Sequence, residues 1–410
     1  MTGLAVGWAA VELAVPDGSP MGGYAARPGP STGVLDPLQV AAVSIRAGTD
    51  RFVWLVADLP CVNVDLTAAI RDAVPGTVWL SATHTHAGPE TGCTPGGTRT
   101  PPHWLAAVTA AATDAAARAV AAEAPATVEL RRLTLRGVAG QRSGARPRRT
   151  VPVDVLSVHA PGGEVTGVIT VLPVHPTVLD AANRCVSADL AGAVRDGVRE
   201  RTGAWSVAAT GAAGDVSTRP HRREQTPAEC TRLGRVAAAA VVRSLRGPAA
   251  VTAGAPLRSR TAAVALDPKP ATAVPIAALT TALAAAERAG DPVAIRTAAT
   301  ALQAAELARS EPRPADLNCA VAAVRLGSLT LLGLGAEPYL ALRDELDGGA
   351  VLVGYTNGYV GYLPTRAAYG RPDYEVLRTP TAAGSAERAL AAAVDLLEPT
   401  DPIDPNERPA

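Results

Sequence analysis

The sequence predicts an α/β fold in which a mixed β-sheet core is flanked by helices and carries an inserted helical hairpin. Short runs rich in β-branched residues, bounded by turn residues, recur through the first half of the 410-residue chain and predict strands. Alanine-rich stretches with helical spacing lie between and after these runs. Strands that alternate with helices are typical of α/β domains. We expect one domain over residues 1–400 and a disordered tail over 401–410.

The elements are expected in the following order. The opening segment MTGLAVGWAAVELAVPDG predicts a first strand. Further strands are predicted at 38–47, 52–58, 77–82, 127–135, 153–159 and 165–172, and at WSVAAT. Helices are predicted near 65–73, 102–123, 187–201 and 227–245. The strand pattern resumes at 319–334 and 350–355, followed by a loop rich in Pro and Tyr at 357–380 and a last helix at about 383–397.

Residues 275–309 differ from the rest of the chain. The stretches PIAALTTALAAAERAG and PVAIRTAATALQAAELARS form helices readily and are joined at Gly290-Asp291-Pro292. Proline-bearing segments at 268–270 and 312–314 flank them. We therefore predict a helical hairpin inserted at about 270–312. It could form a lid or a surface for a homo-oligomer.

The composition favours a small-molecule substrate over a charged polymer or a membrane. Hydrophobic residues make up 48% of the chain but aromatic residues only 3%, so the core must consist mainly of small aliphatic side chains. The 38 basic residues balance 38 acidic ones, and no net field favours nucleic acid or an anionic membrane. Because no run of about 18 apolar residues is free of charge or of Pro and Gly, no stable membrane association is expected.

The cysteines and the N-terminal segment predict a reducing compartment. Five cysteines, an odd number, are widely spread and form no CxxC pair, which indicates neither a disulfide framework nor a thiolate zinc site. The N-terminal segment has no basic region and carries Glu12 inside its apolar run, unlike a secretion signal. We expect a cytoplasmic protein with reduced cysteines. These are Cys61, Cys93, Cys185, Cys230 and Cys319.

Two histidines follow the strand at 77–82, in the segment ATHTHAGP. Side chains two apart on extended backbone project to the same side, so His84 and His86 could share a metal or divide metal binding from proton transfer. The chain holds only six histidines. A functional pair is favoured over the alternative, a pair of surface histidines.

Three more candidates follow apolar runs or a strand. His175, in VITVLPVHPT, lies where active sites of open α/β sheets gather, although a structural histidine is an alternative. Glu337, in LGLGAEP, would be costly to bury unless paired or bound to metal, and an exposed loop glutamate is its alternative. Ser217, in GAAGDVSTR, is not in a GxSxG elbow and could be an ordinary turn serine.

Four of the seven tyrosines lie between residues 357 and 375, in NGYVGYLPT and the segments after it. This clustering exceeds what packing requires. A phenol can act as an acid, an oxyanion donor or a metal ligand. The loop is therefore a candidate part of a site.

These motifs occur in an order that resembles a known family. HTHAGP, HPT, GDVS, a Gly-rich strand that ends in Glu, and NGYVGYLPT with a trailing YE follow one another, after an N-terminal PMGGY. From Val6 to about Thr381 the chain resembles the catalytic, N-terminal domain of the neutral/alkaline non-lysosomal ceramidases. It looks like a short form that lacks their C-terminal immunoglobulin-like domain. The resemblance implies a zinc-dependent amide hydrolase.

The resemblance also implies roles for individual residues. His86 would be the general base, and Ser217 would lie at the substrate as a nucleophile or a hydrogen-bond donor. Tyr374 and Arg142, the latter in the segment QRS, would stabilise the oxyanion. One Zn²⁺ per chain would be bound by His84, His175, Glu337 and Tyr362.

The chemistry of such a site is coherent. A zinc ion with an open position lowers the pKa of bound water to about 7 and polarises an amide carbonyl. His86 could take the water proton and return it to the leaving amine.

Departures from the family pattern concern the substrate. The GDVS turn continues with Thr218-Arg219 where ceramidases resemble GDVSPN, and a family histidine is absent near residues 34–36. A long acyl groove is not evident. The expected function is the cleavage of a linear N-acyl bond in a small soluble substrate.

Other functions remain open. The same scaffold could perform a lyase or cyclisation step in a biosynthetic pathway, since fold does not fix chemistry. It could also be a non-catalytic binding protein for a small molecule. A TIM-barrel amidohydrolase also begins with HxH, but it needs a later lysine or more histidines than His103, His159 and His221 supply.

Overall fold

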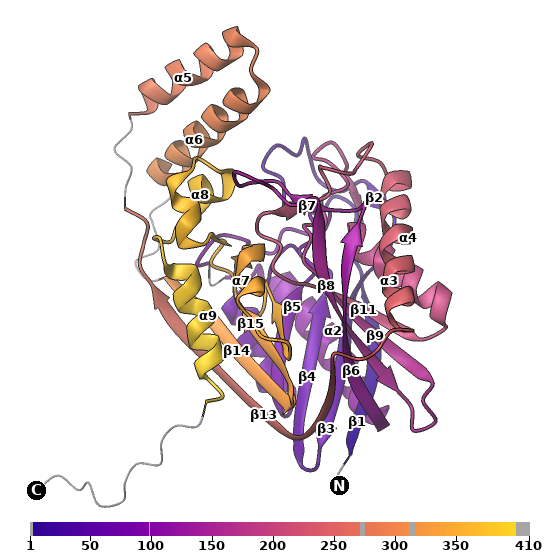
Figure 1. Cartoon of the computed structure of the whole chain (residues 1–410). Helices are drawn as coiled ribbons and strands as arrows, with labels where there is room; N and C mark the ends of the chain where they lie inside the picture. Colours follow the sequence, from indigo (N-terminus) through magenta and orange to yellow (C-terminus); the bar gives the residue numbers. More distant parts are fainter. Residues whose placement is uncertain (1–2, 98, 271–274, 311–316, 399–410) are drawn as a thin grey trace, which may run out of the picture.

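The computed structural model describes residues 3–97, 99–270, 275–310 and 317–398, and it confirms the predicted α/β class (Figure 1). Its centre is a 12-stranded sheet that contains both parallel and antiparallel pairs. One buried cluster takes apolar side chains from every strand of this sheet, so the sheet curls around its own core. No helix in these ranges is long and apolar enough to cross a membrane.

The N-terminal part of the sheet has helices on its outer face. Strands β1, β3 and β4 are antiparallel, and β5 lies parallel to β4. A second buried cluster joins them to α1 and α2. The TIM-barrel alternative is excluded by these antiparallel pairs. The bounds are β1 Leu4–Leu13, β3 Leu38–Ala47, β4 Asp50–Ala57, α1 Val64–Ala73, β5 Thr77–Ala82 and α2 Pro102–Ala121.

Two further helical layers cover the remaining strands, with α3 and α4 on one side and α9 on the other (Figure 1). The middle strands are β6 Ala124–Arg136, β8 Thr150–His159, β9 Val165–Leu172 and β11 Trp205–Thr210, packed against α3 Asp189–Thr202 and α4 Pro227–Ser244. The last strands are β13 Val251–Leu266, β14 Leu317–Gly327, β15 Leu329–Leu334 and β17 Ala350–Val353, packed against α7 Leu340–Asp344 and α9 Ser385–Asp395.

Short elements gather at one end of the sheet. Three two-stranded pieces form there, and they connect segments that are far apart in sequence. They are β2 Gly33–Val34 with β10 Cys185–Val186, β7 Gly140–Gln141 with β12 Val216–Ser217, and β16 Glu337–Pro338 with β18 Tyr362–Leu363. The loop predicted at 357–380 contains β18, a 3₁₀ helix at Arg366–Gly370 and α8 at Tyr374–Arg378.

The carboxyl ends of three strands meet at this end of the sheet. The amide of Ala82, at the end of β5, donates to Tyr355, which follows β17. The amide of Gly354 donates to Thr210 at the end of β11. Segments that leave these strands are therefore brought together, as expected for a site of an α/β protein.

The predicted hairpin is present as α5 (Ile276–Ala289) and α6 (Pro292–Ser310), and it projects from the body of the molecule beside α8 (Figure 1). Residues 312–314 and the predicted tail at 401–410 lie outside the described residues. The 16-residue strand β13 was not predicted, because its sequence VTAGAPLRSRTAAVAL contains a proline and two exposed arginines and lacks a clear alternation.

The prediction that all cysteines are reduced is wrong for one pair in the structure. Cys61 and Cys93 form a disulfide, and their Cα atoms lie 5.8 Å apart. They follow β4 and β5, and these parallel neighbours bring the two following loops together. Their separation of 32 residues matches no spacing motif, so the pairing could not be inferred from sequence. Cys185, Cys230 and Cys319 are free.

Candidate active site

The two histidines of the HTH segment meet, although not on extended backbone. His84 has a φ of 62°, in the left-handed region, so the chain turns sharply as it leaves β5. The expectation of a straight strand through this pair is therefore wrong. The two rings nevertheless lie edge to face, with centroids 4.8 Å apart, and their Nε2 atoms are separated by 3.2 Å.

His175 and Glu337 lie beside this pair. The Nε2 atom of His175 is 2.9 Å from a carboxylate oxygen of Glu337, and the Nε2 atom of His84 is 3.4 Å from the same oxygen. Only 1% of Glu337 is exposed. Tyr359 donates to its other oxygen at 2.6 Å, and Tyr355 donates to the shared one at 3.4 Å. The expectation that a buried glutamate here must be paired is met by the geometry.

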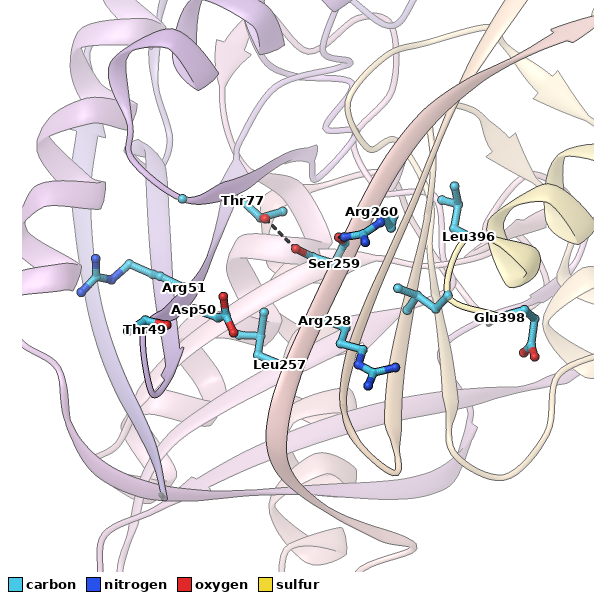
Figure 2. Close-up of a pocket in the computed structure, with 12 residues that line it drawn as sticks. Thr49, Asp50, Arg51, Thr77, Leu257, Arg258, Ser259, Arg260, Leu396 and Glu398 are labelled. Carbon is cyan, nitrogen blue, oxygen red and sulfur yellow. Dashed lines mark hydrogen bonds between the residues drawn. The ribbon is translucent and has the colours of Figure 1, made fainter. Parts of the chain in front are cut away.

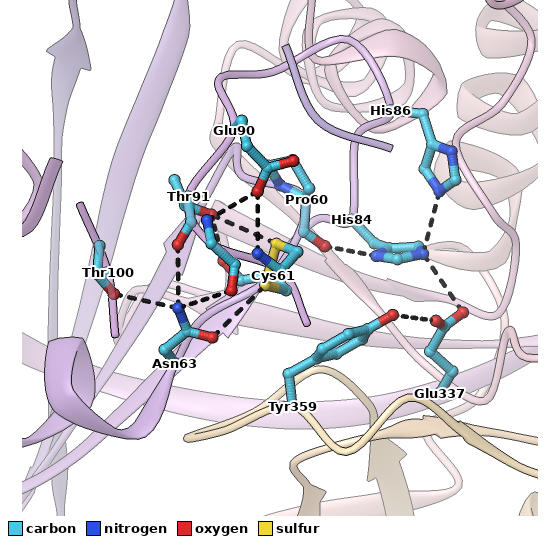
Figure 3. The surroundings of a disulfide bond; sticks show 12 residues. Pro60, Cys61, Asn63, His84, His86, Glu90, Thr91, Thr100, Glu337 and Tyr359 are labelled. Carbon is cyan, nitrogen blue, oxygen red and sulfur yellow. Dashed lines mark hydrogen bonds and ion pairs between the residues drawn. A yellow bond between two sulfur atoms is a disulfide. The ribbon is translucent and has the colours of Figure 1, made fainter. Parts of the chain in front are cut away.

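Backbone carbonyls orient two of the imidazoles, and Figure 3 shows the one that faces His84. Nδ1 of His84 lies 2.5 Å from the oxygen of Pro60, and Nδ1 of His175 lies 2.6 Å from the oxygen of Ala213. A carbonyl can only accept, so each Nδ1 carries a proton and each Nε2 is the nitrogen that faces the cluster. This is the arrangement found around metal-binding histidines.

The donor set fits a metal ion. Nitrogen atoms of His84, His86 and His175 all lie within 4.8 Å of one another. Nδ1 of His86 is buried and has no partner among the described atoms. Imidazole nitrogens with one carboxylate are a set that zinc prefers.

The pKa values of Glu337, His175 and His86 favour the protonation states that bind a cation. Burial would raise the pKa of Glu337, but His84 and His175 hold it well below its usual range. Burial, with the charge of Arg142, lowers the pKa of His175 to about 4. Burial and the neighbouring His84 hold the pKa of His86 well below its usual value. At neutral pH the carboxylate is ionised and His86 and His175 are neutral, which are the states that bind metal.

Tyr362 and Arg142 lie against this cluster. Tyr362 is paired with Glu337 in the short sheet of β16 and β18. Its hydroxyl accepts from the Arg142 guanidinium at 3.1 Å, and its ring stacks on His175 with centroids 6.1 Å apart. The same guanidinium nitrogen is 3.5 Å from Nε2 of His175. Arg142 therefore touches both the tyrosine and the histidine.

The other two predicted residues, Ser217 and Tyr374, differ in exposure. Ser217 is fully buried in β12, and its Oγ accepts from the amide of Arg219 at 3.4 Å. None of its described hydrogen bonds reaches a histidine. Tyr374 begins α8 and is 41% exposed, with its ring centroid 5.9 Å from that of Tyr362 and 5.9 Å from the Arg142 guanidinium carbon. Tyr374 thus stands at the outer edge of the site.

The structure adds a role for Glu375, the glutamate of the YE segment, to which the sequence analysis assigned none. This fully buried carboxylate accepts from Nε of Arg142 at 2.7 Å and from Tyr339 at 3.2 Å, and it also accepts from the Ser143 hydroxyl. The attraction of Arg142 keeps the pKa of Glu375 below its usual range despite its burial. Glu375 therefore fixes the position of Arg142.

The PMGGY segment lies against the second histidine. The ring of Tyr24 packs on His86 with centroids 4.9 Å apart, and Arg27 donates to the His86 carbonyl. Gly23 has a φ of 91°, and a Cβ there would lie 2.6 Å from the Cα of His86. Only glycine allows this close approach. The motif was noticed in the sequence, but its contact with His86 was not predicted.

A cleft of about 360 Å³ opens next to Arg142. One wall comes from Thr297 and Thr300 of the hairpin helix α6, and the others come from α8 and from loops near residues 141–149 and 219–220. A larger hollow of about 660 Å³ lies at the amino ends of β4 and β5, beside β13 (Figure 2). It contains none of the candidate residues. Of these two, the cleft at Arg142 is the one that adjoins the candidate residues, because Arg142 and Tyr374 line it.

Comparison with solved structures identifies the fold. The neutral ceramidase from Pseudomonas aeruginosa matches 97% of this chain with a TM-score of 0.73 and 18% sequence identity, and 74% of that protein is covered. A ceramidase complexed with C2 matches equally well, with 75% of its chain covered. No protein-family model matches the sequence, and no curated protein sequence matches it either. The resemblance expected from the motifs is thus confirmed at the level of the fold: this chain is built like a neutral ceramidase.

Proposed function

We propose that this protein is a zinc-dependent hydrolase that cleaves a linear amide bond, an N-acyl bond, in a small soluble substrate. The observation that carries this proposal is the convergence of two oriented imidazoles on one buried carboxylate. Nε2 of His84 and of His175 both face Glu337, at 3.4 and 2.9 Å. The shared fold with a protein named neutral ceramidase supports amide hydrolysis as the reaction.

The metal would be held by His84, His175, Glu337 and Tyr362. The first three already converge, and the Tyr362 hydroxyl lies 3.1 Å from the guanidinium that touches His175. A zinc ion in such a site activates water and polarises a carbonyl. One zinc per chain is the expected stoichiometry.

His86 is the proposed general base. Its Nε2 faces the cluster, 3.2 Å from Nε2 of His84, and the low pKa leaves it neutral and able to accept a proton from the attacking water. The contact of Tyr24 with the ring and the bond from Arg27 to the backbone hold it in place. The same proton can then pass to the leaving amine.

Arg142 and Tyr374 are proposed to stabilise the developing oxyanion. The guanidinium reaches both the inner cluster and the cleft, and Glu375 holds it there. Tyr374 has a partly exposed phenol on the same cleft. Preorganised donors of this kind typically contribute about 100-fold or more in turnover. Ser217 is proposed to contact the substrate as a nucleophile or as a hydrogen-bond donor.

The test is a screen of the zinc-loaded protein against N-acyl amines of different size and charge, with release of the amine as the readout. We expect cleavage of at least one short amide, and its loss in His84→Ala. Zinc binding without cleavage of any amide would favour a lyase or cyclisation step or a binding function.

The cytoplasmic location remains a proposal, and the disulfide bears on it. Stable disulfides are typical of oxidising compartments. Titration of free thiols in protein taken directly from native cells would decide between the cytoplasm and an oxidising compartment. Five reactive thiols after denaturation would fit the cytoplasm, and three would fit an oxidising compartment, since Cys61 and Cys93 are bonded in the structure.

A further inference from the structure

The two oxygens of the Glu337 carboxylate lie in different surroundings. Oε2 faces the imidazoles, 2.9 Å from Nε2 of His175 and 3.4 Å from Nε2 of His84. Oε1 accepts a hydrogen bond of 2.6 Å from the hydroxyl of Tyr359 (Figure 3). A carboxylate has two oxygens with which it can bind a metal, and here a phenol already engages one of them. Glu337 therefore presents a single oxygen to the histidines.

The backbone keeps Tyr359 in a fixed position relative to Glu337. The amide of Val360 donates to the carbonyl of Gly335 at 2.9 Å, and the short strand that begins with Glu337, β16, pairs with β18. The carbonyl of Tyr359 accepts from the amide of Gly96, also at 2.9 Å. The phenol is thus held from both sides, and its hydroxyl is directed at one oxygen of a carboxylate that is itself fixed.

We infer that Tyr359 is a positioning residue of the metal site: its hydroxyl holds Oε1 of Glu337, so that the carboxylate binds zinc through Oε2 alone. This inference rests on the proposed function and assigns a role to a tyrosine that the resemblance left without one. A carboxylate that binds through one oxygen takes up one position of the ion and leaves another open for water, as catalytic zinc sites require. Groups that orient a ligand in this way typically contribute about 10- to 100-fold to metal affinity.

The test removes the hydroxyl and keeps the ring, in Tyr359→Phe. Without the phenol, the carboxylate can turn and offer both oxygens. We expect zinc affinity, measured by competition with a chromogenic chelator, to fall about tenfold. Cobalt(II) in place of zinc reports the number of ligands, because its visible absorption is strong with four ligands and weakens as their number rises. The cobalt spectrum of Tyr359→Phe should therefore be weaker than that of the wild type.

Two matched variants make the same substitution at other tyrosines. Tyr355→Phe removes the phenol that donates to Oε2 of Glu337 at the longer distance of 3.4 Å. Tyr369→Phe removes a hydroxyl that donates to the carbonyl of Thr381 and not to the carboxylate. Both should keep the wild-type cobalt spectrum, since Oε1 stays bonded to Tyr359. Melting curves establish that each variant is folded.

Infrared difference spectra provide a measurement that needs no variant. They compare the wild-type protein with and without zinc, so that the carboxylate bound to the metal dominates the difference. The two carboxylate stretching bands should move apart, as they do when one oxygen binds. Bands that draw together would show that both oxygens bind, and would overturn the inference.

The outcomes separate this inference from the proposed function. An unchanged cobalt spectrum in folded Tyr359→Phe would overturn the inference, while the proposed function stands if the wild type cleaves amides. If the wild type binds zinc and Tyr359→Phe shows the expected changes but no amide is cleaved, the inference stands and the hydrolase proposal fails. A folded wild-type protein that binds no zinc would overturn both.

Discussion

The inner and outer parts of the site are built in different ways. The inner part, His84, His175 and Glu337, is at most 5% exposed, and backbone carbonyls hold its imidazoles. The outer part comes from loops, α8 and the hairpin, and Tyr374 there is 41% exposed. Side chains locked by buried partners keep a reaction geometry, while exposed loops can change without loss of the fold. The difference suggests that the chemistry is set by the sheet and the substrate by the loops.

The sharpest way to break this comparison is to remove His86, whose ring packs against those of His84 and His175. His86→Ala should keep its zinc and lose about 100-fold or more in turnover, the usual scale for a positioned general base. The measurement pairs metal analysis with amide hydrolysis over a range of pH, where the acidic limb should change shape. If zinc is lost as well, the three clustered histidines are joint ligands and the base must be sought elsewhere, with Glu337 as the first candidate.

A second test concerns Glu375, whose carboxylate accepts a hydrogen bond from Nε of Arg142 and so holds the guanidinium in place. Glu375→Gln leaves the guanidinium without its ionised partner, so we expect a loss of about 3 kcal/mol in the free energy of unfolding. Turnover should fall about tenfold while zinc content stays at one equivalent. Denaturant melts and steady-state kinetics provide the two readouts. Glu345→Gln, at an exposed glutamate, is the control, and equal behaviour of the two variants would refute the anchoring role.

A third test asks whether the disulfide between Cys61 and Cys93 helps to position His84 for metal binding. Pro60, whose carbonyl orients His84, is bonded directly to Cys61 (Figure 3). Cys93→Ser should cost about 2–4 kcal/mol of stability. It should also weaken zinc affinity by about tenfold, a usual scale for groups that orient a ligand. Cys185→Ser, at a free cysteine, should change neither the stability nor the zinc affinity. If zinc affinity were unchanged in Cys93→Ser as well, the disulfide would have no part in holding the metal site.

The smallest effect is expected for a residue of helix α4 that is not one of the candidate site residues. Two hydrogen bonds from Arg232 lower the pKa of Glu229, on α4, to about 2. A lowered pKa stabilises the fold above the unfolded value near 4.5, and this contribution is lost as the pH falls towards 2. Glu229→Gln should therefore cost about 2 kcal/mol at pH 7 and progressively less towards pH 3. Thermal melts across this range would show it, with turnover unchanged at pH 7.

The contrast between local patterns and long-range contacts explains which features could be predicted from the sequence. Strand patterns such as 38–47, 77–82 and 165–172 were predicted at their observed bounds, because alternation and β-branched content are local properties. His84, His86 and His175 could be proposed because each follows a strand. The sharp turn at His84 could not be foreseen, since its left-handed φ depends on how the chain leaves the sheet.

Contacts between residues that are far apart in the sequence could not be predicted. Arg142 and Glu375 are 233 residues apart, and only the folded sheet brings them together. The bond between Cys61 and Cys93 depends on two neighbouring loops in the same way. The strand β13 was missed because half-exposed strands rich in alanine and arginine carry little hydrophobic pattern.

Metal analysis of the purified protein tests the central claim most directly. The account predicts about one zinc per chain in the wild-type protein and in His103→Ala, whose histidine is exposed on α2 and is not part of the cluster. It predicts loss of that zinc in His84→Ala and in His175→Ala, with folding checked by circular dichroism. Full zinc retention in both of these variants, or no zinc in a folded wild-type protein supplied with it, would contradict the account.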